Sequence, residues 1–129
     1  MSKKLIKPDS TDFVQGKILK YGASPDISQV DGRTVLGGVS TRTGAGAIPL
    51  DATLVAVVTT GTDALTLADG VAGQILILTM TTDGGDGTLT PTNLAGGTTI
   101  TFNDVGDTVI LAFDGTNWNI ASNNGATVA

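Results

Sequence analysis

Short apolar runs separated by turn-forming residues dominate the chain from about Ile48 onward, and they constrain the fold more than any other feature. Residues 54–58 and 75–78 are apolar at every position, whereas residues 64–68 and 99–102 alternate between apolar and polar side chains. Runs of this length, bounded by Gly, Asp and Asn, are typical of β-strands. Helical spacing of apolar residues together with helix caps is missing from this region. The sequence therefore predicts an all-β body.

Turn chemistry supports the same interpretation near the C-terminus. Asp114-Gly115 separates the run at 108–113 from Trp118 and Ile120, and Asp-Gly favours the positive φ that a type I′ hairpin turn needs. In that hairpin Trp118 and Ile120 would share the inner face. Asn124-Gly125 predicts a further turn.

A weak internal repeat bears on the architecture. Residues 65–69 resemble residues 100–104, and in each case a Gly and then an apolar run follow. Two such strand–turn–strand units suit a small β-sandwich or a jelly-roll-like barrel, although hairpins built from few residue types also look alike. We expect one of these two architectures.

Charge divides the chain into two parts. The first 42 residues hold all seven basic residues and four Asp, a net charge of +3, whereas the rest holds eight Asp and no basic residue. Pro and Gly interrupt the N-terminal part, which predicts an extended basic arm over residues 1–47 and a β body over residues 48–129. Such an arm would bind an acidic partner surface while the body faces solvent, unless the asymmetry is drift. The arm residues expected to make this contact are Lys3, Lys4, Lys7, Lys17, Ile18 and Lys20.

Residues that carry catalysis are scarce. The chain has no His, Cys or Glu, so only Asp and the arm Lys residues could act as acids, bases or nucleophiles. Half of the twelve Asp residues neighbour Gly, and turn chemistry explains these. The pairs Asp83/Asp86 and Asp104/Asp107 could offer oxygen ligands to Ca²⁺, but neither matches an EF-hand loop. We expect no catalytic residue, no metal and no cofactor.

Other ligand classes are also disfavoured. A body with eight Asp would repel nucleic acid. The basic start precedes no long apolar segment, so we expect neither a secretory signal nor a membrane span, and a soluble protein made in a cytoplasm. A carbohydrate-binding module remains an alternative, and it would need an exposed aromatic platform, for which Trp118 is the only Trp.

The C-terminal sequence resembles one protein class. Residues 113–125, Phe-Asp-Gly-Thr-Asn-Trp-Asn-Ile-Ala-Ser-Asn-Asn-Gly, are similar to the ending of many tailed-bacteriophage virion proteins, and residues 87–91 and 96–102 look like the same group. The resemblance covers about residues 60–126 and is shared by capsid decoration proteins, head fibres and tail fibres. It implies trimeric assembly without catalysis. Small decoration (cement) proteins of this kind extend an N-terminal segment onto the capsid shell.

Together these features lead us to expect a homotrimeric capsid decoration protein on the outer surface of a phage head. Its partners would be two further copies and the major capsid protein, with no nucleic acid and no membrane. A trimeric head-fibre, tail-fibre or adaptor component that contacts the host surface is the main alternative, and an Asp-based enzyme ranks last. The residues expected in the core and trimer strands are Leu54, Val57, Ile75, Ile77 and Trp118.

Overall fold

The computed structural model describes residues 37–129, so the arm contacts expected within residues 1–36 lie outside the described residues. All regular elements of the described part are strands, which confirms the all-β prediction. The ten strands are β1 (Val39–Thr43), β2 (Gly46–Ala47), β3 (Leu54–Val58), β4 (Asp63–Leu67), β5 (Ile75–Thr82), β6 (Gly87–Pro91), β7 (Ile100–Phe102), β8 (Thr108–Phe113), β9 (Trp118–Asn124) and β10 (Thr127–Val128).

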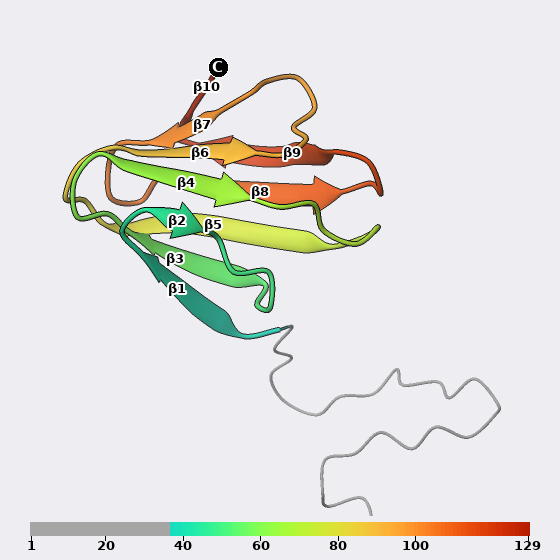
Figure 1. The fold of residues 1–129 in the computed structure, drawn as a ribbon, viewed down its shortest axis with the longest axis horizontal. Coiled ribbons are helices and arrows are strands. Elements are labelled where there is room, and N and C mark those ends of the chain that lie inside the picture. The colour runs from blue at the N-terminus through green and yellow to red at the C-terminus, as the bar shows by residue number, and fades with distance from the viewer. Residues whose placement is uncertain (1–36) are drawn as a thin grey trace, which may run out of the picture. The chain divides into compact units, whose positions relative to one another are not determined.

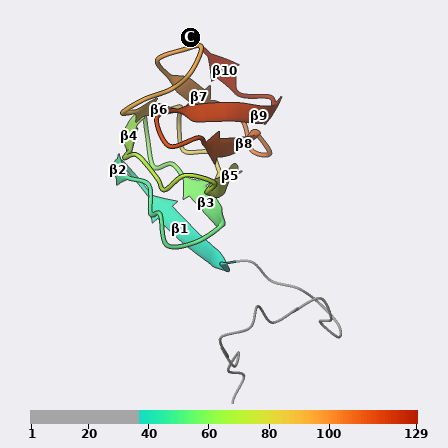
Figure 2. The ribbon, with the colours of Figure 1, turned by 90° about the vertical axis from the view of Figure 1, so that its right-hand side faces the viewer.

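The strands form two five-stranded sheets that pack as a small sandwich (Figure 1). The first sheet has the order β1-β3-β5-β8-β9 and the second has the order β10-β7-β6-β4-β2. Figure 2 shows the two layers, with β2, β4 and β6 on one side and β3, β5 and β8 on the other. Of the two architectures that the sequence predicted, a small β-sandwich and a jelly-roll-like barrel, the structure thus has the sandwich.

Both sheets are mixed. Through β6 the chain alternates between the layers, so β1, β3 and β5 run parallel in the first sheet and β2, β4 and β6 run parallel in the second. Parallel neighbours need a crossover connection, and here a strand of the opposite sheet supplies it. The later strands β7 to β10 pair antiparallel with their neighbours.

The core lies between the sheets and consists mainly of aliphatic side chains. Alternate residues of each strand point inward because successive side chains of a strand face opposite sides. The largest fully buried side chains belong to Trp118 and Phe102. The other fully buried large residues are Leu65, Leu67, Leu76, Leu78, Met80, Leu89, Ile100, Leu111, Val55 and Val57.

Two strands lie N-terminal to Ile48, the boundary that the sequence indicated between arm and body. β1 pairs with β3, and β2 pairs with β4, so the described residues 39–47 belong to the sheets. Neither strand carries an apolar run, because both are short edge strands held by backbone pairing. β6 has the sequence Gly-Thr-Leu-Thr-Pro. It also lacks a run of apolar residues, so the sequence does not predict it as a strand.

Both predicted turns near the C-terminus are present. Asp114 N–H donates to the Asn117 carbonyl at 3.0 Å, Gly115 has φ +102°, and Phe113 pairs with Trp118 across the β8–β9 hairpin. Gly125, between β9 and β10, has φ +93°. The two similar sequence units also take similar paths, since β4 and β7 lie in the second sheet and β5 and β8 in the first.

Candidate functional site

The outer surface of the first sheet carries a row of apolar side chains across four strands. Val39 pairs with Leu54, Leu54 pairs with Ile77, and Ile77 pairs with Ile110. Residues opposite each other in a sheet point to the same side, so these four side chains form one continuous row. The row ends on β9, where Ser122 pairs with Ile110.

A second, shorter row lies beside the first. Ile75 pairs with Ala112, and these two residues stand two positions away from Ile77 and Ile110 on the same strands. Val39 remains 67% exposed and Ile75 remains 45% exposed, while the other members are half-buried. We call this set the apolar face: Val39, Leu54, Ile75, Ile77, Ile110 and Ala112.

A hollow of about 450 Å³ adjoins the apolar face and shares Ile75 and Ile77 with it. Asp51 is the one charged residue in its lining, and its carboxylate accepts a hydrogen bond from Ser40 Oγ at 3.3 Å. Gln74 Nε2 donates to the Leu50 carbonyl at 3.2 Å across the hollow's wall. The remaining lining residues are Gly37, Ala52 and Thr53. The apolar surface is therefore continuous from the face into this hollow.

The outer surface of the second sheet has the same geometry but different chemistry. Thr88 pairs with Thr101, Thr101 pairs with Thr127, and Thr66 pairs with Thr90. Thr is as good a strand former as the aliphatic residues, so strand formation alone does not require Leu and Ile on an outer surface. The difference between the outer surfaces of the two sheets therefore makes the apolar face a candidate contact surface.

Polar residues border the apolar face on the first sheet itself. The next row along the strands contains Thr79 and Thr108, whose hydroxyl oxygens lie 2.8 Å apart in a hydrogen bond. Asn119 pairs with Ala112 on β9. Apolar side chains with a polar rim are the usual composition of a protein–protein contact.

The residues expected from the sequence divide between this face and the core. Leu54, Ile75 and Ile77 lie on the apolar face, whereas Val57 and Trp118 are fully buried between the sheets. The expected arm contacts Lys3, Lys4, Lys7, Lys17, Ile18 and Lys20 lie outside the described residues.

The sequence did not predict three members of the apolar face, namely Val39, Ile110 and Ala112. In the sequence, Ile110 opposes the inward Val109, Leu111 and Phe113, and that pattern could have found it. Val39 gives no such signal, because its strand has no apolar run.

Trp118 is a core residue. Its indole N–H donates to the Ala68 carbonyl at 2.9 Å, and its ring lies 5.1 Å from the Phe113 ring at an interplanar angle of 60°. None of its surface is exposed. A side chain packed in this way does not offer a platform for a sugar ring.

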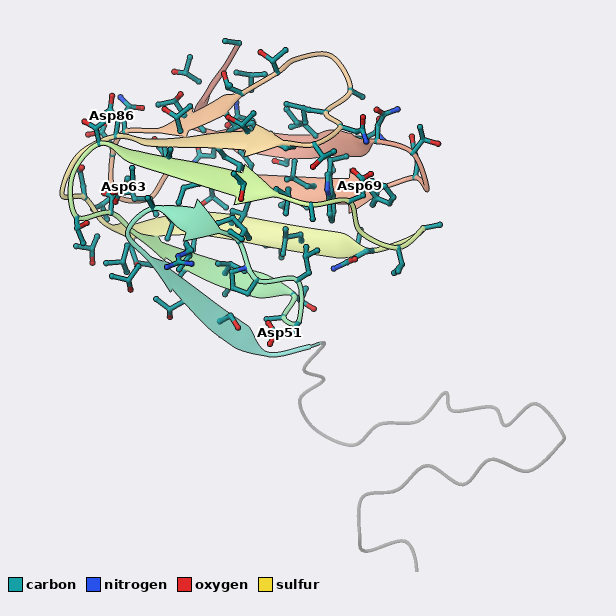
Figure 3. The ribbon with its side chains drawn as sticks, viewed as in Figure 1. Asp51, Asp63, Asp69 and Asp86 are labelled. Atoms are coloured by element: carbon teal, nitrogen blue, oxygen red, sulfur yellow. The ribbon has the colours of Figure 1, made fainter. Side chains whose placement is uncertain are left out.

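Carboxylates of the loops mainly accept hydrogen bonds from nearby backbone N–H groups. Asp107 Oδ2 accepts from the N–H groups of Asn103 at 2.9 Å and Asp104 at 3.1 Å. Asp63 and Asp86 lie together at one end of the strands, away from the end near Asp51 (Figure 3). Within residues 37–129, no group of three or more His, Cys, Asp or Glu residues is placed to hold a metal ion.

Asp114 shows what these turns do to a carboxylate. The N–H of Asn117, the side-chain amide of Asn119 and the N–H of Thr116 all donate to it, and they lower the pKa of Asp114 from its ordinary value. Donors stabilise the charged form, so the turn favours an ionised Asp. Because the carboxylate is fully exposed, we interpret these hydrogen bonds as stabilising the turn.

Neither a protein-family model nor a curated protein matches this chain. Among residues 37–129, no helix is long and apolar enough to cross a membrane.

Proposed function

We propose that this protein is a capsid decoration protein of a tailed bacteriophage, which assembles as a trimer on the outer surface of the head. Its N-terminal region would bind the major capsid protein and hold neighbouring capsid subunits together. The observation that carries the proposal is the uncharged apolar face on a domain whose other outer surface consists mainly of Thr, with Ala47 and Ala64. A face of this kind suits association with other protein surfaces better than it suits chemistry.

The distribution of charge supports a division of labour. Arg42 is the single basic residue between residues 37 and 129, where eight Asp also lie. Its guanidinium is already engaged, since one terminal nitrogen donates to the Thr43 carbonyl at 2.9 Å and the other to the Ala47 carbonyl at 3.3 Å. Attachment to an acidic capsid surface would therefore fall to the six basic residues before residue 37.

The C-terminal residues 113–125, which resemble the ending of phage virion proteins, have a structural role in the core. Residues 113–125 contain the end of β8, the turn after it and β9, and Phe113 and Trp118 pack against each other within the core. A motif that completes a core is consistent with a scaffold protein. The same packing disfavours the carbohydrate-binding alternative, which relied on an exposed Trp.

Attachment would gain strength from the number of arms. Three N-terminal segments on one trimer raise the effective concentration of each contact, so individually weak interactions hold the trimer on the shell. No ligand, cofactor or metal is needed for this role. We propose the outer capsid surface of the virion as its location.

Electron microscopy of purified virions labelled with antibody against residues 37–129 would test the location. We expect label over the head surface and unlabelled tails, with mass spectrometry confirming the chain in the particles. Label restricted to the tail tip or to a fibre would contradict decoration and favour the head-fibre, tail-fibre or adaptor alternative. Virions that lack the chain would exclude both.

A further inference from the structure

We infer that the turn at Asn124-Gly125 is a site of spontaneous covalent modification, at which the Asn124 side-chain amide reacts with the Gly125 nitrogen and is converted to a carboxylate. The inference does not depend on the proposed function or on the oligomeric state. Of the six Asn residues in the chain, Asn124 alone precedes a Gly. A Gly places no side chain beside the attacking nitrogen, which makes this pair the reactive one.

The reaction needs no co-reactant except water. The Gly125 nitrogen attacks Asn124 Cγ, the new C–N bond closes a succinimide ring, and the amide nitrogen leaves as ammonia with the proton that the Gly125 nitrogen loses. Water then opens the ring at either carbonyl carbon. Opening at Cγ gives Asp, whereas opening at the main-chain carbonyl carbon gives isoaspartate, in which the main chain runs through the former side chain.

The folded turn leaves both reacting groups accessible. Asn124 is exposed, and within residues 37–129 its side-chain amide makes no hydrogen bond. The Gly125 N–H likewise donates to no other residue of this range. The neighbouring Asn123 differs, because its Nδ2 donates to the Ala126 carbonyl at 2.8 Å and because Asn124, with a side chain, follows it.

The packing of the turn also requires a Gly at position 125. Its φ is +93°, a left-handed conformation that residues with a side chain rarely adopt. A Cβ there would collide with the carboxylate of Asp107, which is only 6% exposed. That carboxylate is fixed in turn, since its Oδ2 accepts from the N–H groups of Asn103 and Asp104. The fold therefore keeps the reactive Gly next to Asn124.

The turn at Asp114-Gly115 has the same Gly but a different electrophile. Its carboxylate is held by hydrogen bonds from Thr116, Asn117 and Asn119, which also lower the pKa of Asp114. An ionised carboxylate resists attack by a nitrogen nucleophile because it already carries negative charge. This turn is therefore a matched internal control that should stay unmodified.

Modification at Asn124 would weaken the last strand. β10 pairs with β7 through only two residues, Thr127 and Val128. Isoaspartate adds one carbon to the main chain at the end of β9, and Gly125 has no room to move toward Asp107. Ala126, which belongs to the core, would be displaced with it. We therefore expect the β10 edge of the second sheet to loosen as the protein ages.

Peptide mapping by mass spectrometry tests the inference on the folded full-length protein in mildly alkaline buffer. Asn124 should change from amide to acid with uptake of one isotopically labelled oxygen from water, at a rate close to that of a synthetic peptide of residues 119–129. Asn123 and Asp114 should take up no label. Asn124→Gln should remain unconverted at this position, because the larger ring that Gln would form closes far more slowly.

Hydrogen exchange measures the effect on β10. The amides of Thr99 and Ala129 donate to each other's carbonyls at 3.1 and 3.0 Å, and in the isoaspartate form they should exchange roughly 2- to 10-fold faster for each hydrogen bond lost. Freshly prepared Asn124→Asp has the new charge without the longer main chain, so its exchange should match wild type.

Two results would overturn the inference. If the peptide converts while Asn124 of the folded protein does not, the turn protects the amide and the site is not reactive. If the converted protein exchanges at Thr99 and Ala129 as wild type does, the modification has no effect on β10.

Discussion

At the scale of single residues, Trp118 organises one end of the core. Its ring contacts Phe113, and its N–H satisfies the Ala68 carbonyl. Gly70 makes room for it, because a Cβ at that position would lie 2.9 Å from Trp118 Cζ2. The Trp therefore depends on a neighbour without a side chain, which ties the loop after β4 to the last hairpin.

Replacing Trp118 by Ala should cost about 3–5 kcal/mol of the free energy of unfolding, the usual loss for a large buried aromatic side chain. In a domain whose total stability is about 5–15 kcal/mol, chemical denaturation should show this directly. Trp118→Phe keeps a ring but leaves the Ala68 carbonyl without its donor, so we expect a smaller loss of about 1–3 kcal/mol. Denaturation midpoints equal to wild type for Trp118→Ala would mean that the ring is not part of the core.

At the scale of elements, Arg42 joins the two edge strands β1 and β2, which belong to different sheets. Its guanidinium bonds to carbonyls of Thr43 and Ala47, and its Nε is buried without a hydrogen-bond partner. Gly46, with φ +133°, allows the close approach, since a Cβ there would lie 2.9 Å from an Arg42 terminal nitrogen. The side chain thereby closes the sandwich where short strands leave it weakest.

Removing this link should loosen β1 and β2 selectively. In Arg42→Ala, we expect faster hydrogen exchange at the amides of Gly44 and Ile48, which donate to Val58 and Thr66 carbonyls at 2.9 and 2.8 Å. Each lost hydrogen bond contributes about 0.5–1.5 kcal/mol, so exchange should rise by roughly 2- to 10-fold per bond.

Amides of the β8–β9 hairpin serve as the internal control and should exchange as in wild type. Arg42→Lys keeps the charge but not the planar fork of donors, so its exchange should resemble that of Arg42→Ala. Unchanged exchange at Gly44 and Ile48 in both variants would refute the linking role.

At the scale of the whole molecule, the proposed function assigns attachment and assembly to two parts of the chain that differ in charge. The described residues 37–129 contain ten strands and the apolar face, whereas six of the seven basic residues precede residue 37. Attachment and trimer formation should therefore respond to different changes in the chain.

Deleting residues 1–20 should leave a trimer that melts like the full-length protein but no longer coats phage heads. Binding of the full-length protein should weaken with salt, because the Debye length falls from about 10 Å at 0.1 M to about 3 Å at 1 M. Co-sedimentation with purified heads measures both effects. A variant with Lys3, Lys4 and Lys7 changed to Ala separates charge from length, and normal occupancy by the truncated protein would contradict attachment through this segment.

The sequence by itself predicted the fold class and the approximate positions of six strands, β3, β4, β5, β7, β8 and β9. Their apolar runs or alternation reflect burial of one face of a strand, which is a local pattern. β1, β2 and β10 carry no such run because backbone pairing at a sheet edge holds them. β6 has a buried Leu89, but Gly and Pro at its ends conceal it.

Only the tertiary structure decided which side of each doubly apolar strand faces outward. In residues 54–58 both sides are apolar, so periodicity cannot distinguish the buried Val55 and Val57 from the outer Leu54. The parallel register that sets Leu54 beside Ile77 joins residues 23 positions apart in the chain, and no local pattern encodes it. The apolar face exists because distant strands align in this register, which is why the sequence predicted some of its residues but not the surface that they form.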